Sequence, residues 1–406
     1  MPDHAAVPTL ADRFFREAMS PAIRENPYLH YERFRSAAPL LRVADTIWLA
    51  MGHADVTALL RHPRLSTDES HSTAEKAKGV PKARSQSMLF MDPPDHTRLR
   101  GLVARAFTPR RIEELRQATE TIATELVYGM KVRGREADLI EAFAYPLPVR
   151  VICALLGVPA VDEAMFTDWS RAIARGLDPS VLRSPALDAS IDKSRQELRT
   201  YLGDLLAARR KVPGDDLLSA LAAVDVDGDH ISSGEVLALA LLLLVAGHET
   251  TVNLIGNGML ALLRAPEQLD RLRRQPELLG PAVDELLRFD SPVQITQRVA
   301  LEDLEAVAGC PVKAGDEILL ILGAANRDPA VFADPHRLDV TRDARRHVAF
   351  GGGIHHCLGA ALARMEGQIA FRALLDHFPT IELAGTPVRR PTFTLRGLEA
   401  LPVTLT

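Results

Sequence analysis

The segment from Ser233 to Arg264 constrains the fold more than any other part of the sequence. Its first half contains the apolar run VLALALLLLVAG, residues 236–247. Ser232 and Glu235 form an N-cap signature at its start, and Pro266 stops it at the other end. The apolar run is shorter than the roughly 20 residues that a membrane span requires. The segment therefore predicts a long helix buried inside a soluble, helical protein.

The rest of the chain predicts a mainly α protein with small β-sheets. Residues 111–134 and 190–211 carry apolar side chains at the i, i+3, i+4 spacing of an amphipathic helix. Strand signals are few and short, the clearest being TIWLAMG at 46–52 and EILLILG at 317–323. Because we find neither an internal repeat nor a clear linker, we expect residues 1–406 to form a single domain.

Composition argues against several classes of protein. The formal net charge is −5, from 48 Lys and Arg against 53 Asp and Glu, whereas a nucleic-acid-binding protein usually carries a basic excess. The three cysteines, Cys153, Cys310 and Cys357, are odd in number and widely spaced, unlike a disulfide framework. The N-terminus has no basic region followed by an apolar one, as a secretion signal would. We therefore expect a cytoplasmic protein.

Cys357 stands apart from the other two cysteines because of its surroundings. It lies in AFGGGIHHCLGAALARMEG (349–367), between a glycine-rich run and a helix predicted over 358–378. A helix N-terminus favours the thiolate, which is the form that binds a metal. Glycines on both sides let the backbone approach a flat cofactor closely. We expect Cys357 to be a thiolate ligand.

Two simpler interpretations compete with a ligand role. A free cysteine is most often a buried structural residue, which fits Cys153 and Cys310. A zinc site is the other alternative, because His347, His355 and His356 lie nearby. However, the short CxxC spacing of a structural zinc site is missing. The sequence HETTV, which starts like the zinc-protease motif HExxH, lacks its second histidine.

The sequence FGGGIHHCLG is similar to the haem-binding signature of the cytochrome P450 family, Phe-x-x-Gly-x-x-x-Cys-x-Gly. Phe350, Gly353, Cys357 and Gly359 fill its four fixed positions. Three further motifs agree in the family's order, so the resemblance covers essentially the full length. It implies the cytochrome P450 fold of the soluble bacterial kind, with haem b between the long central helix and the helix after the cysteine loop. It also implies that Cys357 binds the haem iron.

The first supporting motif is AGHETT, residues 246–251, in the middle of the long helix. It resembles the family's oxygen-activation motif. The resemblance implies that Ala246 and Gly247 leave room for a diatomic ligand beside the haem. It also implies that Glu249 and Thr250 are the acid–alcohol pair that delivers protons during oxygen activation. The alternative is a helical threonine bonded to an upstream carbonyl and a solvated glutamate.

The second motif is DELLR, which places Glu285 and Arg288 three residues apart on a helix. Such a pair is commonplace on a surface. The resemblance implies a buried, structural pair that an arginine from a later irregular segment joins, and Arg337 matches that position. An aromatic residue is common in the family where this chain has Leu338, so the local packing departs from the pattern.

The third motif is DPPDHTRLR, residues 92–100, which places His96 and Arg100 on one face of a helix. Two cationic donors on one face suit an anion. The resemblance implies that these two residues hold the haem propionates together with Arg298 and His355. A solvated helix face is the alternative.

The resemblance also implies an apolar substrate pocket. Beside Ala246, its expected lining is Met88, Leu89, Phe90, Leu239, Leu242, Leu243, Val293, Ile295, Phe393, Thr394 and Leu395. We expect a medium-sized or large hydrophobic substrate, such as a terpenoid, steroid, fatty acid or polyketide. Ordinary core packing is the alternative at each position.

We expect electrons to come from another protein, because we find no glycine fingerprint for a dinucleotide and no flavin or iron–sulfur region in the sequence. The resemblance implies a ferredoxin-type partner with its reductase, and a monomeric enzyme. Candidate basic contacts near the cysteine are Arg61, Arg64, Arg345, Arg346 and Arg364.

We therefore expect a haem-thiolate monooxygenase that inserts one atom of dioxygen into a hydrophobic small molecule. Two alternatives remain: a peroxide-driven haem peroxygenase, and a non-catalytic haem sensor or recruitment module. The presence of Glu249 and Thr250 counts against both.

Overall fold

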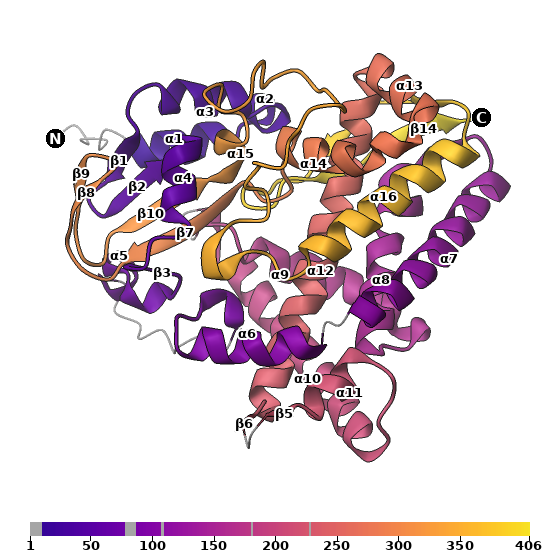
Figure 1. Ribbon diagram of the computed structural model, residues 1–406, viewed down its shortest axis with the longest axis horizontal. Coiled ribbons are helices and arrows are strands. Elements are labelled where there is room, and N and C mark those ends of the chain that lie inside the picture. The colour runs from indigo at the N-terminus through magenta and orange to yellow at the C-terminus, as the bar shows by residue number, and fades with distance from the viewer. Residues whose placement is uncertain (1–9, 78–86, 107–108, 180–181, 227–228) are drawn as a thin grey trace.

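The computed structural model describes residues 10–77, 87–106, 109–179, 182–226 and 229–406. These residues are mainly helical, with small sheets, which confirms the predicted fold class. Figure 1 shows the largest sheet on one side of the molecule and the long helices on the other.

The first half of the chain contributes nine helices among the described residues: α1 (Leu10–Ala18), α2 (Pro21–Glu25), α3 (Tyr28–Arg35), α4 (His53–Leu59), α5 (Thr73–Ala77), α6 (Asp95–Ala106), α7 (Pro109–Arg133), α8 (Pro146–Leu156) and α9 (Phe166–Arg175). The second half contributes α10 (Pro185–Lys211), α11 (Leu217–Ala222), α12 (Ser233–Leu263), α13 (Pro266–Arg274), α14 (Leu279–Phe289), α15 (Leu322–Ala325) and α16 (Ala360–His377). Short helical turns include η2 (Met88–Phe90), η3 (Ile140–Ala144) and η7 (Gly353–His355).

The largest sheet joins strands that lie far apart in the sequence. Its order is β1 (Leu40–Ala44), β2 (Ile47–Ala50), β10 (Glu317–Ile321), β7 (Ile295–Ala300) and β3 (Leu65–Ser66). The β2–β10 pair is parallel and the other three pairs are antiparallel. A second sheet has the order β11 (Ile381–Leu383), β14 (Pro402–Leu405) and β4 (Glu136–Asp138). Two-stranded ladders complete the set: β12 (Val388–Arg389) with β13 (Leu398–Ala400), β5 (Asp225–Val226) with β6 (Asp229–His230), and β8 (Leu304–Val307) with β9 (Cys310–Val312).

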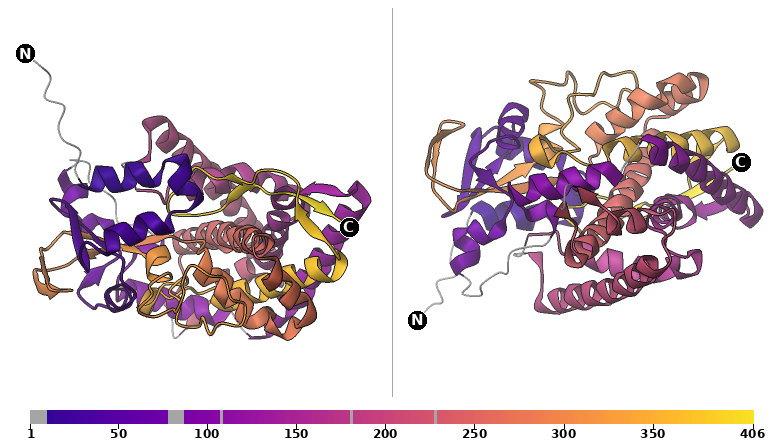
Figure 2. Two further views of the ribbon diagram at one scale, coloured as in Figure 1. Left: turned by 90° about the horizontal axis from the view of Figure 1, so that it is seen from above. Right: turned by 60° about the horizontal axis from the view of Figure 1, so that its bottom comes forward.

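Helix α12 is the long buried helix that the sequence predicts. It starts at a capping box, in which Ser232 Oγ accepts from the Glu235 N–H and the Glu235 carboxylate accepts from the Ser232 N–H. Its length and hydropathy would suit a membrane span, but most of its apolar residues lie in the core of the fold. It packs against α8, α10, α14 and α16. The helix crosses the middle of the molecule in Figure 1, and other helices surround it in Figure 2.

A separate core lies beside the large sheet, where the N-terminal helices contribute an aromatic cluster. Phe14 packs edge-on against Phe15 and Phe34, with ring centroids 5.2 and 5.1 Å apart. Phe393, from the C-terminal region, lies 5.4 Å from Phe15 in the same cluster, and Ile295 is buried there too. Hydrophobic burial thus joins α1 to the segment around Phe393.

Candidate active site

The cysteine loop is held by backbone geometry. The Cys357 N–H donates to the Phe350 carbonyl over 3.0 Å, which closes the loop between the glycine run and α16. Gly353 has φ +65°, and a Cβ there would lie 2.6 Å from the Leu60 carbonyl oxygen, so only glycine fits. Helix α16 begins at Ala360, two residues later than predicted, so Cys357 precedes the helix.

Cys357 is exposed when the whole residue is considered. Its thiol is nevertheless surrounded by protein atoms, and this burial raises the pKa of the thiol. The backbone N–H of Gly359 and the guanidinium groups of Arg100 and Arg364 oppose that rise, because each favours the thiolate. A Cβ built on Gly359 would meet nothing within 4 Å. The open space at Gly359 and the N–H group that favours the thiolate fit a cysteine loop that binds a flat metal cofactor.

The first residue of the AGHETT motif on the central helix, Ala246, is exposed to solvent. It lies in the middle of a core helix, and its exposure fits a position that faces a ligand. A Cβ at Gly247 would lie 3.0 Å from Ile152 Cδ1 on α8, so this glycine also permits close packing of two helices. Its predicted role of leaving room for a diatomic ligand stays a prediction.

Glu249 is fully buried, so the alternative of a solvated glutamate is wrong. One carboxylate oxygen, Oε2, accepts a hydrogen bond from the Arg390 guanidinium. Burial raises the pKa of Glu249, but the neighbouring His248 and Arg390 outweigh it and hold the value at about 2. The Thr250 hydroxyl donates to the Ala246 carbonyl over 2.8 Å, as expected for a helical threonine.

Four basic side chains gather beside the cysteine loop. The rings of His96 and His355 lie 4.2 Å apart between centroids. His96 is buried, and neither of its ring nitrogens has a hydrogen-bond partner among the described residues. Arg298 is only 4% exposed and forms no ion pair with a described residue; its guanidinium donates to the Gln297 carbonyl over 2.8 Å. Arg100 donates to the His356 carbonyl over 2.6 Å.

Burial, with a smaller contribution from neighbouring positive charges, lowers pKa values within this basic cluster. Burial and the charges of His96, Arg298 and Arg100 lower the pKa of His355 to about 3. Burial also lowers the pKa of Arg298 to about 10. Positive groups that depress one another, with unpartnered nitrogens among them, fit a doubly anionic ligand such as the two propionates of haem. The residues present therefore fit the predicted cofactor.

The buried ion pair of the DELLR motif forms as predicted, but its third member differs. Glu285 and Arg288 have fully buried side chains joined by two hydrogen bonds. Arg342 supplies the additional guanidinium, with Nε 3.2 Å from Glu285 Oε1. Arg337 was predicted to do so, but its side chain is 63% exposed and pairs with Asp339. The chain after Pro335 therefore places an arginine five residues later than predicted against the pair.

The expected pocket residues separate into two groups. The first group is partly or fully exposed, as residues that face a ligand can be: Leu89 is exposed, and the half-buried members are Phe90, Leu242, Leu243 and Val293. The second group is buried and consists of Met88, Leu239, Ile295, Phe393, Thr394 and Leu395. Ile295 and Phe393 pack in the cluster around Phe14, and Leu239 is fully buried in the main core, which fits the alternative of core packing at these three positions. Their place in a substrate pocket stays a prediction.

Asp178, which the sequence analysis did not identify, holds the turn that contains Phe393 and Thr394 through hydrogen bonds. Asp178 Oδ1 accepts from both backbone N–H groups, over 3.0 and 2.7 Å. The Thr394 hydroxyl donates to the Leu177 carbonyl. An aspartate in a loop gives no signal of such a distant partner. Arg390 was missed as a partner of Glu249 for the same reason, because 141 positions separate the two residues.

Most of the arginines proposed as partner contacts already have acidic partners within the chain. Arg64, Arg345 and Arg364 bond to Glu302, Asp343 and Asp284 respectively. Arg61 and Arg346 are exposed and form no ion pair with a described residue.

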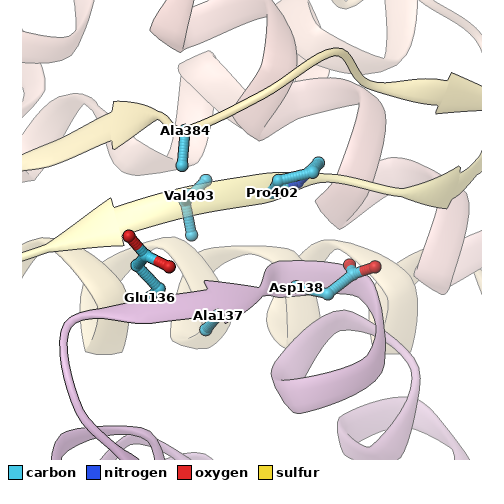
Figure 3. A pocket seen from close by; sticks show the side chains of 6 residues that line it. All are labelled: Glu136, Ala137, Asp138, Ala384, Pro402 and Val403. Carbon is cyan, nitrogen blue, oxygen red and sulfur yellow. The ribbon is translucent and has the colours of Figure 1, made fainter.

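A shallow pocket at the edge of the second sheet lies apart from this site. Its lining consists of Glu136, Ala137, Asp138, Ala384, Pro402 and Val403, as Figure 3 shows. None of these residues belongs to the predicted motifs.

The chain is similar to known proteins over most of its length. A family model described as cytochrome P450 matches residues 183–400. The chain is 45% identical over 390 residues to vitamin D(3) 25-hydroxylase of Pseudonocardia autotrophica, covering 94% of each chain. It is 45% identical to cytochrome P450 monooxygenase PikC of Streptomyces venezuelae, covering 93% of this chain and 91% of that protein. Ligand-free CYP164A2 of Mycobacterium smegmatis superposes with a TM-score of 0.90 at 41% identity, covering 97% of this chain and 99% of the other.

The protein belongs to the cytochrome P450 family. It is a haem-dependent monooxygenase, a class of enzyme that takes electrons from a redox partner and acts on hydrophobic molecules.

Proposed function

We propose that this enzyme binds haem b through Cys357 and oxidises a medium-sized or large hydrophobic molecule with electrons from a ferredoxin. When bound, the haem supplies the activation of dioxygen, and an axial thiolate favours O–O cleavage. Support for Cys357 as the ligand comes from the Gly359 N–H, which favours the thiolate, and from the open space that a Cβ at Gly359 would enter. Glu249 and Thr250 hold and pass protons beside the reacting oxygen.

The observation that carries the proposal is the basic cluster beside the cysteine loop. His96 is buried with both ring nitrogens unpartnered, and Arg298 is buried without an ion pair among the described residues. An uncompensated buried cation costs several kcal/mol, on the order of 3–5 when a partner is removed. Two haem propionates would supply the missing anions within reach of Arg100, Arg298, His96 and His355.

An optical spectrum of the reduced protein with carbon monoxide tests the ligand. A strongly red-shifted Soret band is expected for the wild type and for Cys153→Ala and Cys310→Ala, because neither cysteine belongs to the loop. Cys357→Ala should lose that band. If Cys357→Ala keeps it, the assignment of the ligand is overturned.

The substrate is proposed from the names of relatives and from the apolar positions on α12. Relatives of about 40% identity include 6-deoxyerythronolide B hydroxylase and pentalenic acid synthase. A similar structure of CYP109E1 from Bacillus megaterium holds testosterone. Leu242, Leu243 and Val293 offer half-buried apolar surface that suits such molecules. We therefore propose a steroid, terpenoid, fatty acid or polyketide as substrate, and a screen by optical binding shifts tests it.

A carrier-bound substrate is the second possibility, because one similar structure, P450BioI, is a complex with an acylated acyl carrier protein. The comparison of a free fatty acid with the same acid on its carrier protein distinguishes the two. Tighter binding of the carrier-bound form alone would overturn the proposal of a free substrate.

The ferredoxin proposal rests on Arg61 and Arg346, the two exposed arginines without acidic partners near the cysteine loop. Their charge should steer an acidic partner, so affinity should fall as salt rises. The double variant Arg61→Ala, Arg346→Ala should weaken binding and flatten the salt dependence. A dependence that is already flat in the wild type would exclude steering by charge.

Product formation with hydrogen peroxide alone tests the alternative that the enzyme is a peroxygenase. If peroxide supports product formation at the rate of the reconstituted electron chain, the enzyme is a peroxygenase. If no compound of a broad library is oxidised while carbon monoxide still binds, a sensor or recruitment role is favoured instead.

We also propose that residues 1–406 form one domain and act as a monomer in the cytoplasm. The pairing of strands that lie far apart in the sequence supports a single domain, because β10 pairs with β2 and β14 pairs with β4. Light scattering after size exclusion measures the oligomeric state.

A further inference from the structure

Thr67 is a buried threonine whose hydroxyl contacts one of the histidines beside the cysteine loop, although none of the predicted motifs contains it. Its Oγ1 lies 3.3 Å from Nε2 of the His355 ring, and the residue is 6% exposed. Thr67 follows β3 directly and precedes His355 by 288 positions. The contact therefore joins the edge of the largest sheet to the cysteine loop.

The Thr67 hydroxyl holds the ring of His355 at one nitrogen only. Oγ1 also lies 3.2 Å from the Met91 carbonyl oxygen, to which it donates. A hydroxyl has one hydrogen and two lone pairs, so Oγ1 can accept from Nε2–H at the same time. No hydrogen bond involves His355 Nδ1 within the part of the chain that the structure describes. Nδ1 is therefore the nitrogen that remains for a ligand.

The same hydroxyl can hold either tautomer of the neutral ring. When Nδ1 carries the hydrogen and donates to a carboxylate, Nε2 becomes an acceptor. The Thr67 hydroxyl can then turn away from the Met91 carbonyl and donate to Nε2. A valine in place of Thr67 does neither, because a methyl group has no hydrogen to donate and no lone pair.

Thr67 is itself held by a carboxylate. Asp92 Oδ1 accepts from the Thr67 N–H over 3.1 Å, and Asp92 Oδ2 accepts from the Ser66 hydroxyl. The backbone carbonyl of Asp92 accepts from the His96 N–H over 3.0 Å, at the start of α6. Asp92 therefore connects the end of β3 with the helix that carries His96 and Arg100.

The elements that supply the basic side chains meet at Thr67. The ring centroids of His96 and His355 lie 4.2 Å apart, so the orientation of one ring limits that of the other. Strand β3 pairs with β7, which carries Arg298, and Thr67 comes directly after β3. Thr67 thus lies where a hydroxyl can fix one ring of the cluster without taking the place of a ligand.

We propose that Thr67 is a positioning residue for haem binding: its hydroxyl fixes the orientation of the His355 ring and leaves Nδ1 for a propionate. This role rests on the proposed function, because it assigns His355 to a propionate of the haem. A group that is ordered in advance binds more tightly, since less conformational freedom is lost on binding. Loss of the hydroxyl should therefore speed the release of haem.

Transfer of haem from the ferric protein to apomyoglobin tests the role without any measurement of activity. Thr67→Val should raise the rate constant of haem dissociation about fivefold, the usual effect of one lost hydrogen bond. Thr67→Ser keeps the hydroxyl and should recover most of the wild-type behaviour. An unchanged rate in Thr67→Val, or a rate in Thr67→Ser as fast as in Thr67→Val, overturns the proposal.

A double-mutant cycle separates positioning from a general loss of packing. His355→Ala removes the ring that Thr67 is proposed to hold, so the additional change Thr67→Val should then have no further effect on haem dissociation. If the effect of Thr67→Val persists at full size without the imidazole, Thr67 acts through another group and the role is overturned.

Thr57→Val is the matched control for the loss of a threonine hydroxyl. Thr57 is half-buried on α4, and its Oγ1 is buried without a hydrogen-bond partner among the described residues. This variant should release haem at the wild-type rate. An increase as large as that of Thr67→Val would show that the loss of any inward hydroxyl has this effect, which overturns a specific role.

A crystal structure of the haem-loaded protein decides the geometry. We expect Thr67 Oγ1 on His355 Nε2 and a propionate on Nδ1. A propionate on Nε2, or on the Thr67 hydroxyl itself, overturns the positioning role. A protein that binds no haem overturns this role and the proposed function together. If the wild type binds haem and the Thr67 variants alone behave like it, only this inference fails.

Discussion

Glu285 and Arg288 face each other through two hydrogen bonds of 2.6 and 2.9 Å, and neither side chain is exposed to solvent. Arg288 Nη1 also donates to the carbonyls of Asn326 and Pro335, over 2.9 and 3.0 Å. The Asp339 N–H donates to the carboxylate. One ion pair on α14 therefore holds the irregular segment that leads to the cysteine loop.

Removal of the carboxylate should destabilise the whole protein. Glu285→Ala leaves the buried Arg288 guanidinium uncompensated, so we expect the free energy of unfolding to fall by about 3–5 kcal/mol. Chemical unfolding followed by circular dichroism measures the change. Haem content should fall with it, because the segment before Cys357 loses its anchor.

Two arginines provide matched controls for that prediction. Arg342→Ala removes a charged hydrogen bond to Glu285 and should cost about 1.5–3 kcal/mol. Arg337→Ala removes only exposed contacts and should change stability by less than about 0.5 kcal/mol. Equal effects of the two substitutions would contradict the assignment of Arg342 as the third member.

Two glycines of the cysteine loop should respond differently to a methyl group. Gly353→Ala forces a side chain into φ +65° and against the Leu60 carbonyl, which costs at least about 1–2 kcal/mol in the left-handed backbone alone. Gly359→Ala meets no atom within 4 Å, so the haem-free protein should keep its stability. We expect Gly359→Ala to weaken haem binding instead, because the methyl group takes open space that a flat cofactor would need next to the cysteine loop. Unfolding curves and haem titration separate the two effects, and normal haem affinity in Gly359→Ala would contradict this use of the space.

The long helix and the cysteine loop could be predicted from the sequence because their signals are local. Apolar composition and a capping box define α12 within its own residues, and the helix ends at Leu263, one residue from the expected end. The loop is similarly specified by its glycines and by the helix that follows Cys357. Such features need no knowledge of what lies across the fold.

Partners far apart in the sequence could not be predicted in the same way. Arg342 rather than Arg337 reaches Glu285, because the path of an irregular segment decides which side chain turns inward. Gly247 belongs to a helix contact that only the position of Ile152 reveals. Phe393 joins an aromatic cluster formed by the opposite end of the chain. In each case tertiary packing selects among residues that look equivalent in the sequence.

The pH dependence of stability should contain a contribution from Glu249. Its pKa is about 2 in the folded protein against an ordinary value of 4.5, chiefly because His248 and Arg390 oppose the effect of burial. The unfolded chain therefore binds more protons between these values, so the stabilisation is present above about pH 4.5 and is lost as pH falls towards about 2. Glu249→Gln should give a shallower decline over that range, measured by urea unfolding. Identical slopes for the two proteins would contradict the depressed pKa.

Arg390 should matter to the same carboxylate at neutral pH. Arg390→Leu leaves Glu249 ionised, buried and without its guanidinium partner, so the free energy of unfolding at about pH 7 should fall by several kcal/mol, on the order of 3–5. The double variant Arg390→Leu, Glu249→Gln should recover part of that loss, because no unpaired charge remains. A double-mutant cycle from thermal unfolding measures the coupling, and a coupling of zero would contradict the pair.

Asp178 should hold the turn around Phe393 and Thr394 through a single oxygen. Asp178→Ala leaves two buried backbone N–H groups without an acceptor, and each such group costs about 1–3 kcal/mol. Asp178→Asn keeps an oxygen in the Oδ1 position, so it should retain most of the stability. Burial raises the pKa of Asp178, so a neutral amide also avoids the cost of burying a charge. Differential scanning calorimetry compares the two variants. We expect this difference because the two N–H groups need an acceptor and not a charge. If Asp178→Asn destabilises the protein as much as Asp178→Ala, the charge of Asp178 and not its oxygen holds the turn.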